Sequence, residues 1–292
     1  MSIHRTKMKQ KENINDVLAE PELKNAIHSY DVIGDIIVIR LHPELEPEKE
    51  RIAEAFHAFY PKARTIVAVP LHSHTEELYR TRALDVIWGE DKLETTHREY
   101  GCIFKVDLEH VFFSPRLSYE RQRVAQKVAP GDTIINMFSG VGCFSILIAK
   151  TQPQTTIYSI DVNPYAYEYM LENVALNKVE GQVIPILGDA RTELDKLEGV
   201  ADRVLMPLPE NADSFLPAAV KALNRNKECM IHFYAVSTGS RDDNLFDTPF
   251  ERVKDIISYE DSLRLEVEEK RIVRSVGPRK YHVVLDLRIA FV

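Results

Sequence analysis

The stretch TIINMFSGVGCFSILIAK, residues 133–150, decides the fold. An apolar strand-like run leads into the glycine-containing turn SGVG at 139–142, and the spacing of Phe144, Leu147 and Ile148 predicts an amphipathic helix after it. A strand, a tight turn and a helix in this order begin a unit in which the next strand lies parallel to the first. The rest of the chain can be interpreted outward from this unit.

The alternation of strand and helix continues to the C-terminus. The runs TTIYSID, QVIPILGD, DRVLMPLP and ECMIHFYAV are typical of strands, and the helical stretch PYAYEYMLENVALN after the first has proline in its first turn. Two further strand-like runs surround a Gly277-Pro278 turn. We therefore predict an α/β fold over residues 125–292: a doubly wound, mostly parallel, seven-stranded Rossmann-like sheet with helices on both faces, closed by a hairpin. This architecture resembles that of the large class of methyltransferases.

The pattern is different before residue 125. Short β-rich runs occupy 31–41, 63–71 and 102–108, and a stretch with helical spacing, EPEKERIAEAFHAFY, lies between the first two. We predict a smaller N-terminal α+β domain over residues 31–124. Residues 1–30 are polar and are expected to form a tail.

Composition narrows the protein class. The chain has 292 residues, of which 45% are hydrophobic and 28% charged, values typical of a globular protein without membrane spans. The N-terminus lacks the apolar segment of a signal peptide, so we expect a cytoplasmic protein. Cys102, Cys143 and Cys229 are scattered and have no metal-ligand spacing, so we expect reduced, packed thiols and no metal site.

The net charge and the distribution of basic residues do not identify the binding partner. The net charge of −8 argues mildly against a nucleic-acid partner, because phosphate contacts need Lys and Arg. However, five basic residues fall within eleven positions that contain no acid: Lys270, Arg271, Arg274, Arg279 and Lys280. Such a cluster is more often a solvated face than a binding site.

Polar and small residues follow four successive strands of the predicted sheet. Ligands of doubly wound sheets lie beyond the carboxyl ends of the strands, where glycines permit close approach and an acid can accept hydrogen bonds from ribose hydroxyls. A dinucleotide site would have a third glycine where this chain has Ser145, so S-adenosyl-L-methionine fits better than NAD. The expected cofactor-binding residues at these strand ends are Phe138, Gly140, Gly142, Asp161, Val162, Asp189, Ala190 and Pro207.

Three strings together resemble one family: FFSPRLSYERQRV at 112–124, NMFSGVGCFSI at 136–146 and DVNPYAYEYMLENVALNKVE at 161–180. It is the archaeal and eukaryotic tRNA methyltransferase family that modifies N1 of guanosine 37. The similarity runs from about residue 30 to the end, and Ser-Pro-Arg-Leu-x-x-Glu-Arg is its most specific part. The resemblance implies a class I S-adenosylmethionine fold, that cofactor, and the anticodon stem-loop of tRNA as partner. It also implies that the domain at 31–124 binds RNA and positions the target.

The resemblance also implies roles for particular residues. Methylation at N1 of guanine requires a proton acceptor and a group that stabilises charge on O6. Glu120 matches the family's catalytic glutamate. Arg80 matches the arginine that faces O6, with Arg82 as the alternative in a shifted register, and Arg121 matches a position beside the methionine end of the cofactor.

The chain departs from the family pattern in three places. Pro207-Leu208-Pro209 replaces Asn-Leu-Pro or Asn-Pro-Pro, which removes an amide that could contact guanine or cofactor. Cys143 stands where proline is usual. Longer family members carry a further N-terminal domain, which we expect to be absent here because about thirty residues precede Asp31.

Two other functions remain open at this stage. The related wybutosine-pathway enzyme transfers an aminocarboxypropyl group from the same cofactor to the same tRNA position, but Arg116, Phe144 and Asp161-Val162-Asn163-Pro164 favour methyl transfer. A non-catalytic RNA-binding module with a methyltransferase-like fold is the second, and Pro207 is its main support. Methylation of an amino group is disfavoured, because residues 207–210 lack its motif. We expect a monomer.

Overall fold

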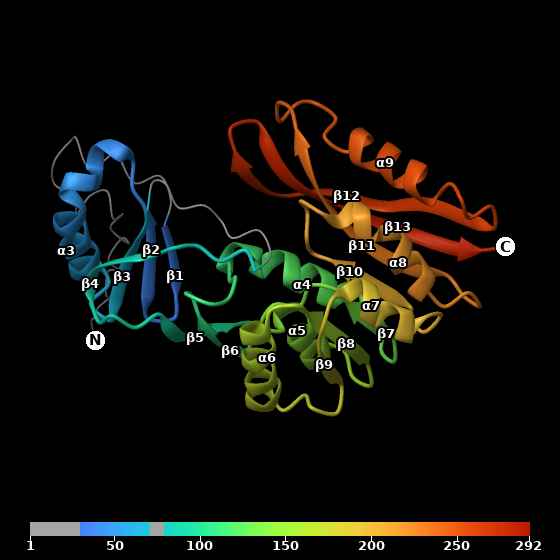
Figure 1. Cartoon of the computed structure of the whole chain (residues 1–292), viewed down its shortest axis with the longest axis horizontal. Coiled ribbons are helices and arrows are strands. Elements are labelled where there is room, and N and C mark those ends of the chain that lie inside the picture. The colour runs from blue at the N-terminus through green and yellow to red at the C-terminus, as the bar shows by residue number, and fades with distance from the viewer. Residues whose placement is uncertain (1–29, 71–78) are drawn as a thin grey trace, which may run out of the picture.

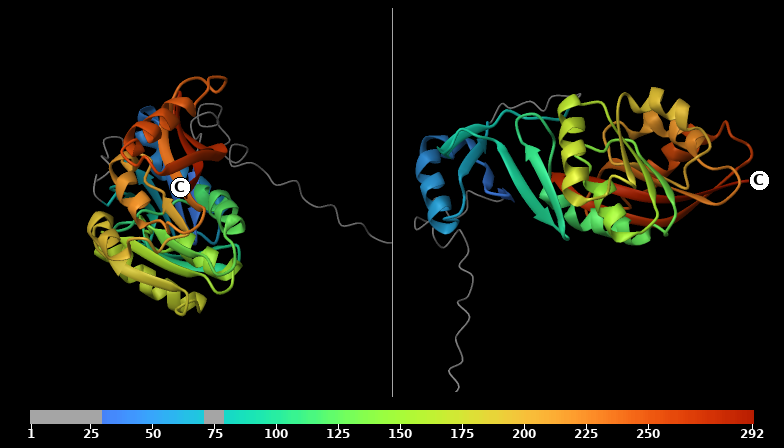
Figure 2. Two further views of the ribbon diagram at one scale, coloured as in Figure 1. Left: turned by 90° about the vertical axis from the view of Figure 1, so that its right-hand side faces the viewer. Right: turned by 90° about the horizontal axis from the view of Figure 1, so that it is seen from below.

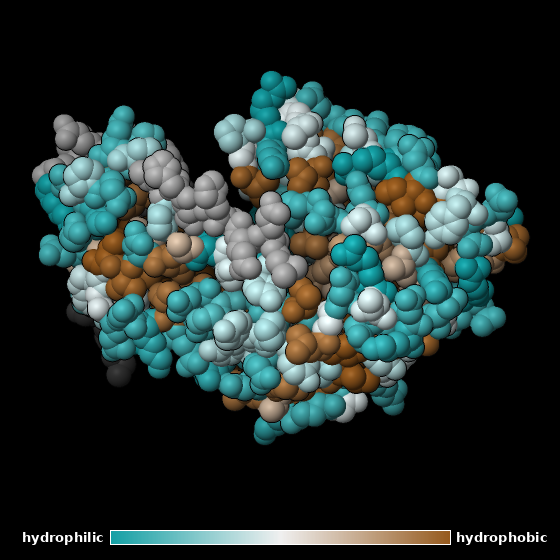
Figure 3. Space-filling model, viewed as in Figure 1, coloured by the Kyte–Doolittle hydropathy of each residue, from teal (hydrophilic) through white to brown (hydrophobic). Residues whose placement is uncertain are grey.

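The computed structural model describes residues 30–70 and 79–292. These residues form two lobes that lie side by side, the smaller one built from the N-terminal third of the chain (Figure 1). In the space-filling view a notch separates the two lobes on one edge, and hydrophilic side chains cover most of this face (Figure 3). No helix among the described residues is long and apolar enough to cross a membrane. The expected tail at 1–30 lies almost wholly outside the described residues.

The small lobe is a four-stranded sheet in the order β1-β2-β3-β4. Its strands are β1 (Tyr30–Ile33), β2 (Ile36–Arg40), β3 (Thr65–Val69) and β4 (Asp85–Gly89), with η1 (Pro43–Glu48) and α3 (Lys49–Phe59) between β2 and β3. Ile52 and Phe56 of α3 are fully buried against Ile66 and its neighbours in the sheet. The β-rich run at 31–41 is two antiparallel strands, because Gly34 turns the chain with a φ of 57°.

A two-stranded hairpin connects the lobes. It consists of β5 (Glu94–Glu99) and β6 (Cys102–Asp107), and is followed by η2 (Pro115–Leu117) and α4 (Ser118–Lys127). The side-chain amides of Asn173 and Asn177 hydrogen-bond to both the N–H and the C=O of Lys105 and Ile103 in β6, with donor–acceptor distances of 2.6–3.0 Å. On the other side, Thr95 in β5 donates to Asp35 in the β1–β2 turn at 2.6 Å. The hairpin therefore has specific hydrogen bonds to both lobes.

The large lobe contains the predicted seven-stranded sheet, in the order β12-β13-β11-β10-β7-β8-β9. The parallel strands are β7 (Thr133–Asn136), β8 (Thr156–Asp161), β9 (Val183–Leu187), β10 (Arg203–Met206) and β11 (Cys229–Thr238). The terminal hairpin, β12 (Leu263–Gly277) and β13 (Lys280–Phe291), joins it antiparallel to β11. This fold class is as predicted from the strand–helix alternation.

Helices cover both faces of this sheet (Figure 2). Side chains of α4, α5 (Cys143–Thr151) and α6 (Pro164–Asn177) belong to one core cluster. Side chains of α7 (Ala190–Leu194), α8 (Ala212–Ala222) and α9 (Asp247–Ile257) belong to the other. The prediction that α5 is amphipathic is wrong: residues 143–149 are all buried, since α5 is packed against α4 and α6 as well as the sheet. The three cysteines are buried free thiols, as expected.

Candidate active site

A cleft of about 860 Å³ lies at the carboxyl ends of β7, β8, β9 and β10. The segments that follow these four strands form one wall, as expected for a doubly wound sheet. The opposite wall comes from Tyr79, Arg80 and Arg82, and from the segment between Phe112 and Arg121. Both lobes therefore contribute to the cleft.

The glycine turn after β7 adopts a conformation that other residues rarely reach. Gly140 and Gly142 have φ angles of 53° and 89°, and the Gly142 N–H donates to the carbonyl of Ser139 at 2.9 Å. Gly140 lies on the cleft wall. Gly142 does not, and a Cβ there would meet Ile146 and Met170 at 3.1 Å. Of the two predicted cofactor glycines, Gly140 faces the cleft while Gly142 shapes the turn.

Asp161 at the end of β8 is fixed by the backbone around it. Its carboxylate accepts the N–H of Gly140 at 2.6 Å and the N–H of Asn163 at 3.0 Å. Burial raises the pKa of Asp161, although these backbone hydrogen bonds act in the opposite direction. The two bonds orient the carboxylate at the cleft wall beside Val162, where it fits the hydroxyls of a ribose.

The next strand end has an acid beside aromatic rings. Asp189 accepts the backbone N–H of Arg191 at 2.9 Å, and the Arg191 guanidinium lies 4.6 Å from the centre of the Phe215 ring. Phe215 in turn packs edge-on against Phe138, with 4.9 Å between ring centres. Together with Ala190 these groups offer an apolar slot with polar edges that fits an adenine base. Pro207, directly after β10, also lines the cleft.

Arg80 and Glu210 meet across the cleft from opposite lobes. Arg80 Nη2 lies 2.9 Å from Glu210 Oε1, and the guanidinium lies 5.1 Å from the centre of the Phe112 ring. Glu210 also lies 3.3 Å from His282 Nε2. Burial alone would raise the pKa of Glu210, but the hydrogen bond from His282 and the charge of Arg80 outweigh it and lower the pKa to about 2.

Arg121 lines the cleft, but its charge is already neutralised. Its Nε and Nη2 each lie 2.6 Å from an oxygen of Glu99, a bidentate ion pair in which both side chains are buried. Its Nη2 also donates to the carbonyl of Ser114 at 3.2 Å. Arg121 therefore holds the wall in shape between β5 and α4.

Glu120 is part of a buried charge network and is not among the residues that line the cleft. Its Oε1 accepts from Tyr234 Oη and from Arg123 Nη2, both at 2.7 Å. The Tyr234 ring packs against Phe144, which does line the cleft, with 6.3 Å between ring centres. The Glu120 carboxylate thus lies behind the wall, and its side chain is 3% exposed.

The same network contains Asp286, which is fully buried. Asp286 lies 2.6 Å from both Arg123 Nη1 and His232 Nδ1, and 2.8 Å from Lys127 Nζ. Burial alone would raise the pKa of Asp286, but hydrogen bonds from His232, Arg123 and Lys127 hold it far below its usual range. This network ties α4 to β11 and β13.

Family models match most of the chain. The model of the TRM5/TYW2 methyltransferase domain matches residues 95–276, and the model of the TYW2 N-terminal domain matches residues 10–92. The chain belongs to the TRM5/TYW2 family. The boundary between the two matches falls between β4 and β5, about thirty residues before the change of sequence pattern at 125.

Relatives within the TRM5/TYW2 family have more than one activity in their names. A tRNA (guanine(37)-N(1))-methyltransferase, Trm5b of Pyrococcus abyssi, is 36% identical over 90% of this chain and 75% of its own length. A tRNA 4-demethylwyosine(37)-methyltransferase, Taw21 of Saccharolobus solfataricus, is 38% identical over 88% of this chain and 92% of its own.

Solved structures agree with the fold and the cofactor. The complex of aTrm5 with tRNALeu is 32% identical, with a TM-score of 0.80 over 97% of this chain and 80% of that one. Methanocaldococcus jannaschii TYW2 in complex with AdoMet is 26% identical, with a TM-score of 0.69 over 90% of this chain and all of that one. The predicted family, fold and S-adenosyl-L-methionine dependence are confirmed.

The structure brings most of the predicted TRM5/TYW2 site residues together, but not all. Arg80, its alternative Arg82 and most of the predicted cofactor residues share one cleft, whereas Gly142 and Glu120 lie outside its wall. The sequence interpretation missed Glu210 on the wall. Its one sequence signal is its position directly after the Pro-Leu-Pro that departs from the TRM5/TYW2 pattern.

Proposed function

We propose that this chain transfers a methyl group from S-adenosyl-L-methionine to N1 of guanosine 37 in tRNA. The observation that carries the proposal is the position of Arg80, which lies on the same cleft as the strand ends that fit the cofactor. The anticodon stem-loop as the part of tRNA that is bound, a monomeric enzyme and the cytoplasm as compartment belong to the same proposal. The cofactor, when bound, supplies the methyl group.

Arg80 has the chemistry that the target base requires. As N1 loses its proton and gains the methyl group, electron density moves onto O6, and a guanidinium beside O6 stabilises it. Glu210 holds Arg80 at 2.9 Å in the present arrangement, so O6 would replace a Glu210 oxygen as the partner of Arg80. Glu210 thus keeps the arginine paired and oriented until the base arrives.

Glu120 is the proposed acceptor of the N1 proton, by its match to the family string. Its carboxylate now accepts from Tyr234 and Arg123, so the proposal requires it to turn past Phe144 when the base binds. Catalytic hydrogen bonds often form only in the substrate complex, and such a rearrangement is compatible with the fold. The shift would leave the Arg123–Asp286 pair in place.

A second candidate function is methylation of 4-demethylwyosine at the same tRNA position. It is supported by the relative of that name, which matches nearly its whole length to this chain. Pro207 supports it too, because proline has no side-chain amide for guanine at the place where the TRM5/TYW2 string usually has asparagine.

One experiment separates these activities. The enzyme is incubated with S-adenosyl-L-methionine and either unmodified tRNA or tRNA that carries 4-demethylwyosine, and the nucleosides are analysed by mass spectrometry. We expect 1-methylguanosine from the unmodified tRNA. Methylation of the demethylwyosine tRNA alone would establish the second candidate, and addition of an aminocarboxypropyl group would contradict both. No product from either tRNA would indicate a binding module.

A further inference from the structure

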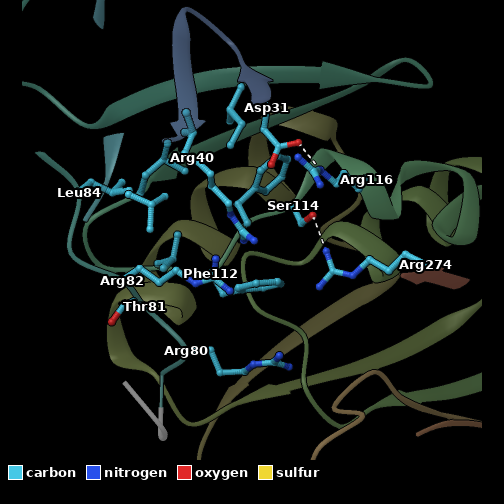
Figure 4. Close-up of a pocket in the computed structure, with 16 residues that line it drawn as sticks. Asp31, Arg40, Arg80, Thr81, Arg82, Leu84, Phe112, Ser114, Arg116 and Arg274 are labelled. Carbon is cyan, nitrogen blue, oxygen red and sulfur yellow. Dashed lines mark hydrogen bonds and ion pairs between the residues drawn. The ribbon is translucent and has the colours of Figure 1, made fainter. Parts of the chain in front are cut away.

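A second, smaller pocket lies between the two lobes and is lined by five arginines. It has a volume of about 110 Å³, room for a single small anion (Figure 4). The arginines come from four parts of the fold, namely β2, the segment before β4, η2 and β12, and they are Arg40, Arg80, Arg82, Arg116 and Arg274. None of these parts could assemble the pocket alone.

Among the described residues, carboxylates neutralise only two of these arginines. Asp31 lies 2.6 Å from Arg116 Nε, and Glu210 lies 2.9 Å from Arg80 Nη2. Arg274 donates to the neutral Ser114 hydroxyl at 3.2 Å. Within residues 30–70 and 79–292, Arg40 and Arg82 form no ion pair. Counted over the part of the chain that the structure describes, the pocket therefore has an excess of three positive charges.

Holding these cations together has a cost in the free protein. Burial and the like charges of Arg80 and Arg116 lower the pKa of Arg274 to about 10. Burial, with the charges of Arg40 and Arg80, also lowers the pKa of Arg82. A partly buried group of like charges is unfavourable until an anion enters, and guanidinium groups match the oxygens of a phosphate.

We propose that this pocket binds a backbone phosphate of the tRNA next to the target nucleotide. The inference rests on the proposed function for the identity of the RNA. The pocket shares Arg80, Arg82 and residues 112–114 with the cofactor cleft, so a base in the cleft has its own flanking phosphates within reach of the pocket. The arginines come from both lobes, so the bound phosphate would also fix the small lobe against the large one.

This site also gives a role to part of the basic cluster at 270–280. Arg274 points into the pocket, whereas Arg271 lies over the Tyr119 ring and Lys270 lies near Asp247. The cluster is thus not one continuous surface, and we assign the phosphate contact to Arg274 alone among these three.

The first test measures tRNA binding as a function of salt concentration for Arg40→Gln, Arg274→Gln and the double variant. Each lost phosphate contact should reduce the slope of log affinity against log salt by about 0.7–0.9. Arg264→Gln is the matched control, because Arg264 is exposed at the opposite end of the same strand β12. An unchanged slope in the double variant, with intact folding by circular dichroism, would overturn the proposal.

The second test removes the charge from the RNA. Anticodon stem-loops are made with a neutral methylphosphonate at the phosphate on either side of position 37. We expect one of the two substituted stem-loops to bind wild type more weakly than the normal stem-loop does. The same substituted stem-loop should bind Arg40→Gln as tightly as the normal stem-loop binds that variant. An equal loss from Arg40→Gln with the normal RNA and with both substituted RNAs would overturn the proposal, because it would show that Arg40 contacts neither of these two phosphates.

These measurements do not depend on turnover. If the enzyme binds tRNA in this way but forms no 1-methylguanosine, the proposed function fails and the phosphate site stands. If it methylates guanosine 37 while the arginine variants bind as wild type does, the phosphate site fails alone.

Discussion

Around Arg123, three cations meet three carboxylates. Glu120 and Asp286 contact Arg123, and Asp286 and Glu269 contact Lys127, at 2.6–2.8 Å, while Arg271 lies 3.7 Å from Glu120. Around Arg82, five arginines share two acids. Both regions are rich in charge and partly or fully buried, but as far as the structure describes the chain only the first is balanced. A balanced buried network holds helices and strands together, whereas an unbalanced one has a place for a ligand's charge.

The largest effect should come from Glu120→Gln, because this residue belongs to the balanced network and yet is proposed to act on the substrate. Loss of a proton acceptor typically lowers the rate about 10²–10⁴-fold, while cofactor affinity should stay close to that of wild type. The measurement is the single-turnover methylation rate with tRNA and cofactor saturating.

Glu210→Gln is the control for Glu120→Gln, since Glu210 already lies in the cleft. For Glu210→Gln we expect a smaller fall in the single-turnover methylation rate, because Arg80 loses the carboxylate that orients it. If Glu120→Gln reacts at the wild-type rate while Glu210→Gln loses the larger factor, the proton acceptor is Glu210 and Glu120 belongs only to the structural network.

The second-largest effect should be a fall in the free energy of unfolding when the balanced network is broken. Asp286→Asn leaves Arg123 and Lys127 without this carboxylate, and loss of one partner from a buried pair typically costs about 3–5 kcal/mol in the free energy of unfolding. Urea denaturation measures it. Glu266→Gln on the exposed face of β12 is the comparison and should change stability by less than about 1 kcal/mol.

The difference in the free energy of unfolding between wild type and Asp286→Asn should also depend on pH. The pKa of Asp286 is lowered in the folded protein, so its stabilisation is complete above the unfolded value of about 3.9 and is lost as the pH falls below it. Wild type and variant should therefore converge in strong acid. A difference that is the same at pH 7 and pH 3 would show that the charge of Asp286 does not stabilise the network.

The smallest effect should come from the unbalanced pocket. Arg82→Gln removes a cation that has no ion pair among the described residues, so the free energy of unfolding should change by no more than about 0.5 kcal/mol, toward greater stability at low salt. Thermal denaturation at two salt concentrations measures it. A loss of 2 kcal/mol or more would mean that Arg82 has a structural partner, and the contrast between the two regions would weaken.

Local sequence patterns predicted the sheet and the strand ends that form one wall of the cleft. The strand ends at Phe138, Asp161, Asp189 and Pro207 follow runs whose apolar character marks them as buried parallel strands, and parallel strands place their carboxyl ends on one edge. The short strands β4 and β5 were missed, because neither sequence alternates between apolar and polar residues. Glu94–Glu99 is polar throughout, and Asp85–Gly89 has three apolar residues in a row.

Contacts between distant residues could not be predicted in the same way. Tyr234 lies 114 positions from Glu120, and Glu210 lies 130 positions from Arg80. Nothing local to Glu120 indicates that its helix is covered by β11 and β13, and an acidic, arginine-rich helix is ordinarily an exposed one. The arginine pocket depends on four separate elements and on the position of one lobe against the other.

The paired amides of Asn173 and Asn177 on β6 have a consequence for assembly. Packing of apolar side chains tolerates small sliding, but these amides each bind one N–H and one C=O of a particular residue in the strand. A strand repeats the same orientation only every second residue, so the next equivalent fit lies about 6.6 Å away. The hairpin is thus held on α6 in one register, and a shift by a single residue would break all four of these hydrogen bonds.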